Sequence, residues 1–171
     1  MEKKKKLPLI YVLGMPIIFI VANFMAYLHI EIAGSNLYFS VLLYSLTFLI
    51  SGLIIRKTNY KDALYIMAVT LISASLAFVV EWALMDILNP YLMIYTFISF
   101  LISQLIFIYT YDFLIKIKKD TYIPVFLLVL VVSAIDNAFF GTIVEGQYIS
   151  LSILIRLIYT VALPVVLAKK N

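Results

Sequence analysis

Five charged or amide side chains lie inside long apolar stretches of this sequence, where polar groups are costly. Arg156 is a lone positive charge, and Glu81 and Asp136 are acids that fall at a similar distance from the ends of their own stretches. Asn23 and Gln104 add amides, which both donate and accept hydrogen bonds. Because buried charges are seldom retained for stability alone, the set predicts a functional site. The alternative is a purely structural ion pair, although buried pairs contribute little to stability.

The usual signatures of hydrolytic or metal-dependent catalysis are missing from the sequence. It has no cysteine, and no zinc-ligand spacing, Ser–His pair, P-loop or glycine-rich phosphate loop occurs. The single histidine, His29, falls near the end of an apolar stretch and is assigned no role. Two acids without a metal partner or a nucleophile do not make a hydrolase, so we expect no enzymatic activity, no metal site and no cofactor.

The elements that must position these groups are apolar helices. The chain has 171 residues, is 65% hydrophobic and has a mean hydropathy of +1.10, whereas soluble domains are about half apolar. A transmembrane helix needs about 20 mostly apolar residues. We therefore predict an all-α integral membrane protein, in which residues 1–171 form a single bundle of six transmembrane helices. The helices are predicted at 8–30, 35–55, 62–84, 91–115, 121–141 and 149–167.

The basic residues predict how this bundle is oriented. Arg156 aside, they fall in four short clusters, at residues 3–6, 56–61, 116–119 and 169–170. Cytoplasmic loops collect Lys and Arg, so both termini are expected in the cytoplasm and the loops at 31–34, 85–90 and 142–148 outside. The net charge of +4 is then explained by the cytoplasmic rim and anionic lipid, and no nucleic-acid partner is expected.

Most of the buried polar groups are expected in the outer half of the bundle. At about 1.5 Å per residue, four of the five lie roughly 5–10 Å below the outer surface, and Gln104 lies near the midplane. Asn137 directly follows Asp136, and Phe139 is one of several aromatic residues at this depth that either cover a flat ligand or face lipid. The pattern predicts a pocket open to the outside and sealed from the cytoplasm by apolar helix ends. Ser and Thr stripes at helical spacing are more simply explained as helix–helix contacts.

Several short motifs, spread over most of the chain, occur together in one family of transporters. They are Asn23, the run 45–51 (SLTFLIS) before the charged segment 56–63, the run 99–104 (SFLISQ), Ser133 and Asp136 with Phe139 after them, and Arg156 with Pro164. In these motifs the chain resembles the vitamin-uptake-like, queuosine-precursor transporter family. The chain departs from the family pattern at several positions: Gly52 and Phe107 stand where the family often has acids, a basic residue before the fourth helix is missing, and Arg156 stands where the family more often has Lys.

The resemblance implies import of a small nitrogen-rich solute, a 7-deazaguanine queuosine precursor, across the plasma membrane of a prokaryote. A guanine-like edge presents an N–H and an amino group side by side, which Asp136 can accept together. Gln104 and Asn23 would orient the ring, and Arg156 would hold the carboxylate or donate to a ring carbonyl.

Two other functions stay open at this level. The family is similar in architecture to the substrate-binding subunits of energy-coupling-factor vitamin transporters, which implies an alternative in which a separate ATP-driven module energises uptake. The third is a membrane protein with no role in transport. The expected partners are the solute, the lipid bilayer and, in the second case, the energising module.

Overall fold

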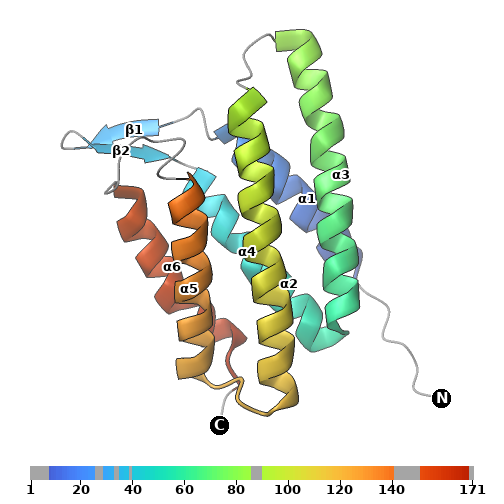
Figure 1. Cartoon of the computed structure of the whole chain (residues 1–171), viewed down its shortest axis with the longest axis vertical. Helices are drawn as coiled ribbons and strands as arrows, with labels where there is room; N and C mark the ends of the chain where they lie inside the picture. The colour runs from blue at the N-terminus through green and yellow to red at the C-terminus, as the bar shows by residue number, and fades with distance from the viewer. Residues whose placement is uncertain are drawn as a thin grey trace.

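The structure of the protein, a computed structural model, consists of six helices and one small β-hairpin (Figure 1). It describes residues 8–25, 29–32, 35–38, 40–85, 90–140 and 151–169, with side chains described at 8–25, 43–80, 94–136, 138 and 158–169. In chain order the elements are α1 (Leu9–Phe24), β1 (His29–Ile32), β2 (Ser35–Tyr38), α2 (Ser40–Lys57), α3 (Tyr60–Met85), α4 (Pro90–Lys116), α5 (Tyr122–Phe140) and α6 (Leu151–Leu167). The predicted helical class and the order of six helices are confirmed.

The hairpin corrects two helix boundaries that the sequence led us to expect. We predicted a helix over 8–30 and another from residue 35, but α1 ends at Phe24 and α2 begins at Ser40. Strands β1 and β2 pair antiparallel, with His29 opposite Tyr38 and Ile32 opposite Ser35. β1 alternates polar and β-branched residues (HIEI), and only two residues, Ala33 and Gly34, separate the strands in the sequence. Each strand is only four residues long, too short for this alternation to stand out between two apolar stretches.

The start of α3 and the end of α4 follow local capping chemistry. The side-chain oxygen of Asn59 accepts the backbone N–H of Asp62 at 3.1 Å, which caps the first turn of α3. At the end of α4, the N–H of Lys118 bonds the Ile115 carbonyl, and the N–H of Lys119 bonds the Leu114 carbonyl. This is the bonding of a Schellman motif, and Lys118 adopts the positive φ of 54° that the motif requires. The chain therefore turns sharply at 117–121 into α5.

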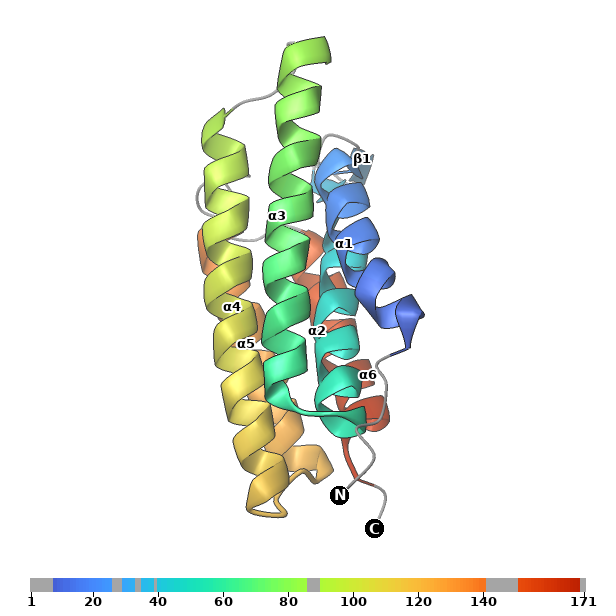
Figure 2. The same cartoon turned by 90° about the vertical axis from the view of Figure 1, so that its right-hand side faces the viewer.

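Helix α2 lies at the centre of the bundle, with contacts to α1, α3, α4 and α6. Every pair of successive helices is in contact, as short connections require, while α1 with α3, α2 with α4 and α2 with α6 are contacts between non-successive helices. Figure 2 shows α3 and α4 side by side as the two longest rods, with α1 packed against α3. Buried polar residues of α2 are thus placed where α1, α4 and α6 can reach them.

One end of the molecule carries the clustered charges. The connections after α2 and after α4 lie at the same end of the molecule as the end of α6 (Figure 1). We call this the basic end, because the described Lys and Arg side chains gather there. They are Arg56, Lys57, Lys61, Lys116, Lys118, Lys119 and Lys169. The hairpin lies near the opposite end, where β2 contacts α6 (Figure 1).

The outward faces of several helices are apolar. On α1 the exposed residues include Leu13, Ile17 and Val21, spaced three or four apart, and α3 exposes Ile72 and Leu76 in the same way. Soluble monomers rarely present continuous apolar faces of this kind. Within the described residues, two segments are long and apolar enough to cross a membrane, Tyr60–Val80 and Ile94–Lys116. The segments Leu9–Phe24, Tyr122–Asp136 and Ile158–Leu167 are apolar but shorter.

Candidate functional site

The buried carboxylate of Asp136 joins α5 to α4. Ser99 of α4 donates its hydroxyl to Asp136 Oδ1 at 2.6 Å, and the Asp136 residue is only 5% exposed. Sequence spacing put both residues on interior faces, and the structure brings them together across 37 positions of the chain. A carboxylate carries two oxygens with about four acceptor positions, so it can accept hydrogen bonds from more than one donor. The side chain of Asp136 is therefore a buried acceptor in the bundle interior.

The polar stripe of α4 continues on either side of this bond. Thr96, Ser99 and Ser103 are all buried, at the spacing that places them on one face of the helix. The Ser103 hydroxyl donates to the Ser99 carbonyl at 2.6 Å, so it is satisfied by its own helix. The Ser99 hydroxyl reaches the carboxylate, so Ser99 helps to orient Asp136.

Asn23 and a group of aromatic rings lie on the facing part of α1. Asn23 is buried and its amide N–H donates to the Phe19 carbonyl one turn earlier, at 2.7 Å. The Phe19 ring packs against Phe100 of α4, with centroids 4.2 Å apart, and against Tyr44 of α2 at 5.4 Å. Phe100 directly follows Ser99, so this aromatic cluster borders the Asp136–Ser99 pair. This bond uses the amide nitrogen of the Asn23 side chain, and the side-chain oxygen takes no part in it.

Gln104 is the centre of a second buried network, closer to the basic end. Its residue is 0% exposed, its Oε1 accepts from Ser51 at 2.7 Å, and its Nε2 donates to Thr47 at 2.8 Å. The Thr47 hydroxyl donates a hydrogen bond to the Tyr44 carbonyl at 2.6 Å. The Ser51 hydroxyl also lies 3.8 Å from Met15 Sδ of α1. These bonds connect α1, α2 and α4, so the amide is committed to helix packing in this structure.

An apolar layer separates the Gln104 network from the basic end. Ile54, Phe107, Tyr111 and Leu167, from α2, α4 and α6, are fully buried. The Phe107 and Tyr111 rings stack at 5.5 Å with 14° between their planes. This layer matches the apolar seal that the sequence predicts on the cytoplasmic side.

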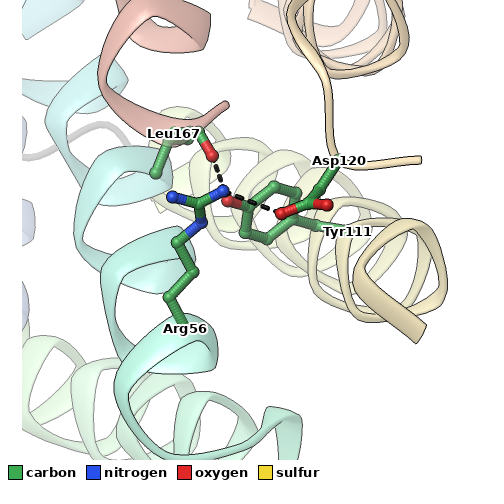
Figure 3. A network of polar contacts seen from close by, with 4 residues as sticks. All are labelled: Arg56, Tyr111, Asp120 and Leu167. Carbon is green, nitrogen blue, oxygen red and sulfur yellow. Dashed lines mark hydrogen bonds and ion pairs between the residues drawn. The ribbon is translucent and has the colours of Figure 1, made fainter. Parts of the chain in front are cut away.

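Beyond this layer lies a network of polar contacts (Figure 3). Arg56 of α2 pairs with Asp120, in the connection between α4 and α5, at 2.8 Å. The Tyr111 hydroxyl donates to the Leu167 carbonyl at 2.5 Å, and the N–H of Lys169 donates to the Asp120 carbonyl at 2.8 Å. The Arg56 guanidinium reaches across beside the Tyr111 hydroxyl (Figure 3). Four segments of the chain are thus joined at one point.

An open pocket of about 590 Å³ adjoins this network at the basic end. Arg56, Asp120, Asp112 and Lys169 bring two positive and two negative charges to its wall. Asp112 is already paired with Lys116 at 2.6 Å. Because its charges balance, the pocket offers little preference for an anion or a cation. The remaining lining residues are Ile55, Thr58, Asn59 and Ile115.

The seven residues predicted as a binding site divide into two sets. The structure describes the side chains of Asn23, Gln104 and Asp136, and all three are buried. The side chains of the other four lie outside the described residues, and so does the expected pairing of the arginine with an acid. These four are Glu81, Asn137, Phe139 and Arg156.

Sequence reasoning missed the pair between Arg56 and Asp120. Both residues belong to charged segments at the basic end, where solvated side chains are the usual expectation. One signal was available, because Asp120 is an acid within a predicted cytoplasmic loop of lysines. Gly52 and Phe107, which depart from the family pattern, also have apolar surroundings in the structure. Phe107 is part of the buried layer, and a Cβ on Gly52 would lie 2.6 Å from Leu167 Cδ2.

Comparisons of the chain with family models, with curated proteins and with solved structures find no match. Support for a function therefore comes from the buried polar groups and from the motifs that resemble those of the transporter family.

Proposed function

We propose that this chain is a multi-pass membrane protein that binds a small nitrogen-rich solute from outside the cell and imports it. The basic clusters and the six helices support six membrane crossings with both termini in the cytoplasm. The apolar outward faces of α1 and α3 support this arrangement, because they match a lipid environment. The hairpin would lie at the outer interface, since open strand edges are not stable in hydrocarbon.

The observation that carries the proposal is the buried carboxylate of Asp136, oriented by Ser99. Ionisable residues in membrane helices are expensive, and they usually mark a binding site or an ion path. A carboxylate can accept two adjacent N–H groups of a guanidine-like edge. The aromatic cluster beside it supplies rings that can pack on a flat solute.

The motif resemblance gives this solute a chemical identity, a 7-deazaguanine of the queuosine-precursor type. Asp136 would accept its N–H and amino groups. The free carbonyl oxygen of Asn23 offers an acceptor at the facing helix. Gln104 would reach the solute only if its bonds to Thr47 and Ser51 rearrange. Arg156, Glu81, Asn137 and Phe139 complete the proposed site as the sequence predicts it.

Ligand-induced thermal stabilisation of the purified protein tests the proposal directly. A panel of nucleobases, 7-deazaguanines and vitamins should contain a ligand that raises the unfolding temperature of the wild type. Charge-assisted hydrogen bonds are worth about 1.5–3 kcal/mol, so Asp136→Asn should weaken that ligand roughly tenfold to a hundredfold. The matched control is Asp62→Asn, the same chemical change at an exposed acid near the basic end.

Two outcomes would contradict this assignment. If Asp136→Asn binds the identified ligand as tightly as the wild type, Asp136 is structural. If no member of the panel stabilises the protein, the solute class is wrong. Uptake by cells that express this chain alone would separate the self-sufficient importer from a binding subunit that needs an energising module.

Cysteine labelling tests the membrane orientation, because the natural chain has no cysteine. Single cysteines at Ser35, Asn89 and Gln147 are expected to react with an impermeant maleimide in intact cells. Cysteines at Lys61 and Lys118 serve as the opposite-side controls and should react only after the cells are opened. Protection of all three outer positions in intact cells would overturn the six-span arrangement.

A further inference from the structure

We propose that the ion pair between Arg56 and Asp120 is a releasable seal that closes the basic end of the bundle. The inference rests on the proposed function, because a solute that enters from the outer end must leave the interior through this end. The seal lies between the Gln104 network and the open pocket at the basic end. Its release would open the path that the apolar layer now blocks.

The contacts of Asp120 show why one ion pair controls several elements. Its side chain holds Arg56 at the end of α2, and its backbone carbonyl accepts the N–H of Lys169, just past α6. Asp120 itself lies in the connection between α4 and α5. The pair therefore fastens the end of α2 to this connection and, through it, to the end of α6 (Figure 3).

The apolar layer above the pair depends on the same elements. Leu167 fills the space beside Gly52 of α2, and its carbonyl accepts the hydroxyl of Tyr111. Through these two contacts, Leu167 of α6 joins α2 and α4. If the end of α6 moves away from α2, Leu167 leaves Gly52 and the layer loses one of its fully buried members. The path to Ser51 and Gln104 then opens from the basic end.

The pair is strong enough to orient these segments and weak enough to break. The Arg56 side chain is 27% exposed and the Asp120 side chain 11% exposed, so water reaches the pair from the adjoining pocket. Partly hydrated ion pairs exchange partners at little cost, unlike pairs locked in a dry interior. The neutral Gln104 network is completely buried and has no such access to water.

A buried thiol reports directly on the seal. Ser51→Cys places one reactive group in the otherwise cysteine-free chain, immediately above the apolar layer. The rate of reaction with an impermeant maleimide is then measured in membrane vesicles of known orientation. With the reagent at the basic end, the rate should be low with the ion pair intact and should rise at least tenfold when Arg56→Met or Asp120→Asn is added.

The controls separate the ion pair from general charge loss. Lys57→Met removes the same charge from the neighbouring residue, whose amine bonds the Tyr11 hydroxyl at the exposed rim, and should leave the rate low. The exchange of both charges, Arg56→Asp with Asp120→Arg, should restore protection. Thermal unfolding of each variant in detergent shows whether it is folded, and Asp120→Asn, which keeps the shape of the side chain, serves if Arg56→Met does not fold.

Labelling needs no ligand, so its result is independent of the proposed solute. If the folded ion-pair variants react no faster than Lys57→Met, or if Ser51→Cys alone already reacts rapidly from the basic end, the seal does not exist. If labelling behaves as expected but no solute binds or enters, the seal stands and the proposed import is wrong.

Discussion

Two polar networks link α2 to the rest of the bundle, and they differ in charge and in access to water. The Gln104 network is neutral and fully buried, and both polar atoms of the amide are bonded to α2. The network of Arg56 and Asp120 is charged and partly exposed. It joins the ends of α2 and α6 to the connection between α4 and α5. Satisfied neutral groups in a dry interior hold helices in a fixed register, whereas hydrated charges hold them reversibly. The Gln104 network thus fixes the register of helices in the middle of the bundle, whereas the ion pair at the basic end can be released.

The largest effect on stability is expected in the apolar layer that separates the two networks. Phe107 is fully buried and contacts Phe48 and Tyr111, so Phe107→Ala should lower the free energy of unfolding by about 3–5 kcal/mol through the cavity that it leaves. Phe113→Ala is the matched control on the same helix, because Phe113 is 57% exposed. SDS titration of the purified variants measures both. Similar losses for the two would mean that the apolar layer is not a packed barrier.

Loss of the Gln104 amide tests whether the middle network is structural. Gln104→Leu removes the acceptor of the Ser51 hydroxyl and the donor to the Thr47 oxygen, and a buried group that loses its hydrogen bond costs about 1–3 kcal/mol. The triple variant with Thr47→Val and Ser51→Ala should recover most of this loss, because all the interacting polar groups are then replaced. A triple variant no more stable than Gln104→Leu alone would contradict the assignment.

The contact of α2 with α6 is tested by comparing two glycines. A Cβ at Gly52 would lie 2.6 Å from Leu167 Cδ2, whereas at Gly14 the nearest atom recorded is Ile50 Cδ1 at 4.0 Å. Both substitutions to alanine gain helix propensity, but overpacking typically costs about 1–3 kcal/mol, so Gly52→Ala should be less stable than Gly14→Ala by about that amount. Equal unfolding free energies would show that Leu167 moves away without cost.

The smallest effect on stability is expected at the ion pair. Partly exposed pairs contribute about 0–1 kcal/mol, so Arg56→Met should unfold at nearly the wild-type SDS concentration. This small loss is what makes the labelling experiment feasible in a folded protein. A loss as large as that of Phe107→Ala would show that the basic end is a rigid part of the core, which would remove the difference between the two regions.

The sequence predicted the candidate site only in part. Asp136, Asn23 and Gln104 were recognised as buried from their positions in apolar stretches, and all three are buried. Their partners were not recognised, because a hydrogen bond between Ser99 and Asp136 depends on how two helices are rotated against each other. The same limit explains why Gln104, expected near a ligand, is bonded to α2 in the structure.

Hydropathy and charge by themselves determined the six helices, their order and the gathering of basic residues at one end, because these depend on composition and on short-range periodicity. Helix boundaries near the hairpin were wrong, since its alternating pattern is only four residues long in each strand. Only the tertiary structure decided that α2 is central, that Leu167 occupies the space beside Gly52, and that Arg56 meets Asp120 across 64 positions of the chain. Each of these follows from the packing of helices distant in sequence, which the periodicity of a single helix does not specify.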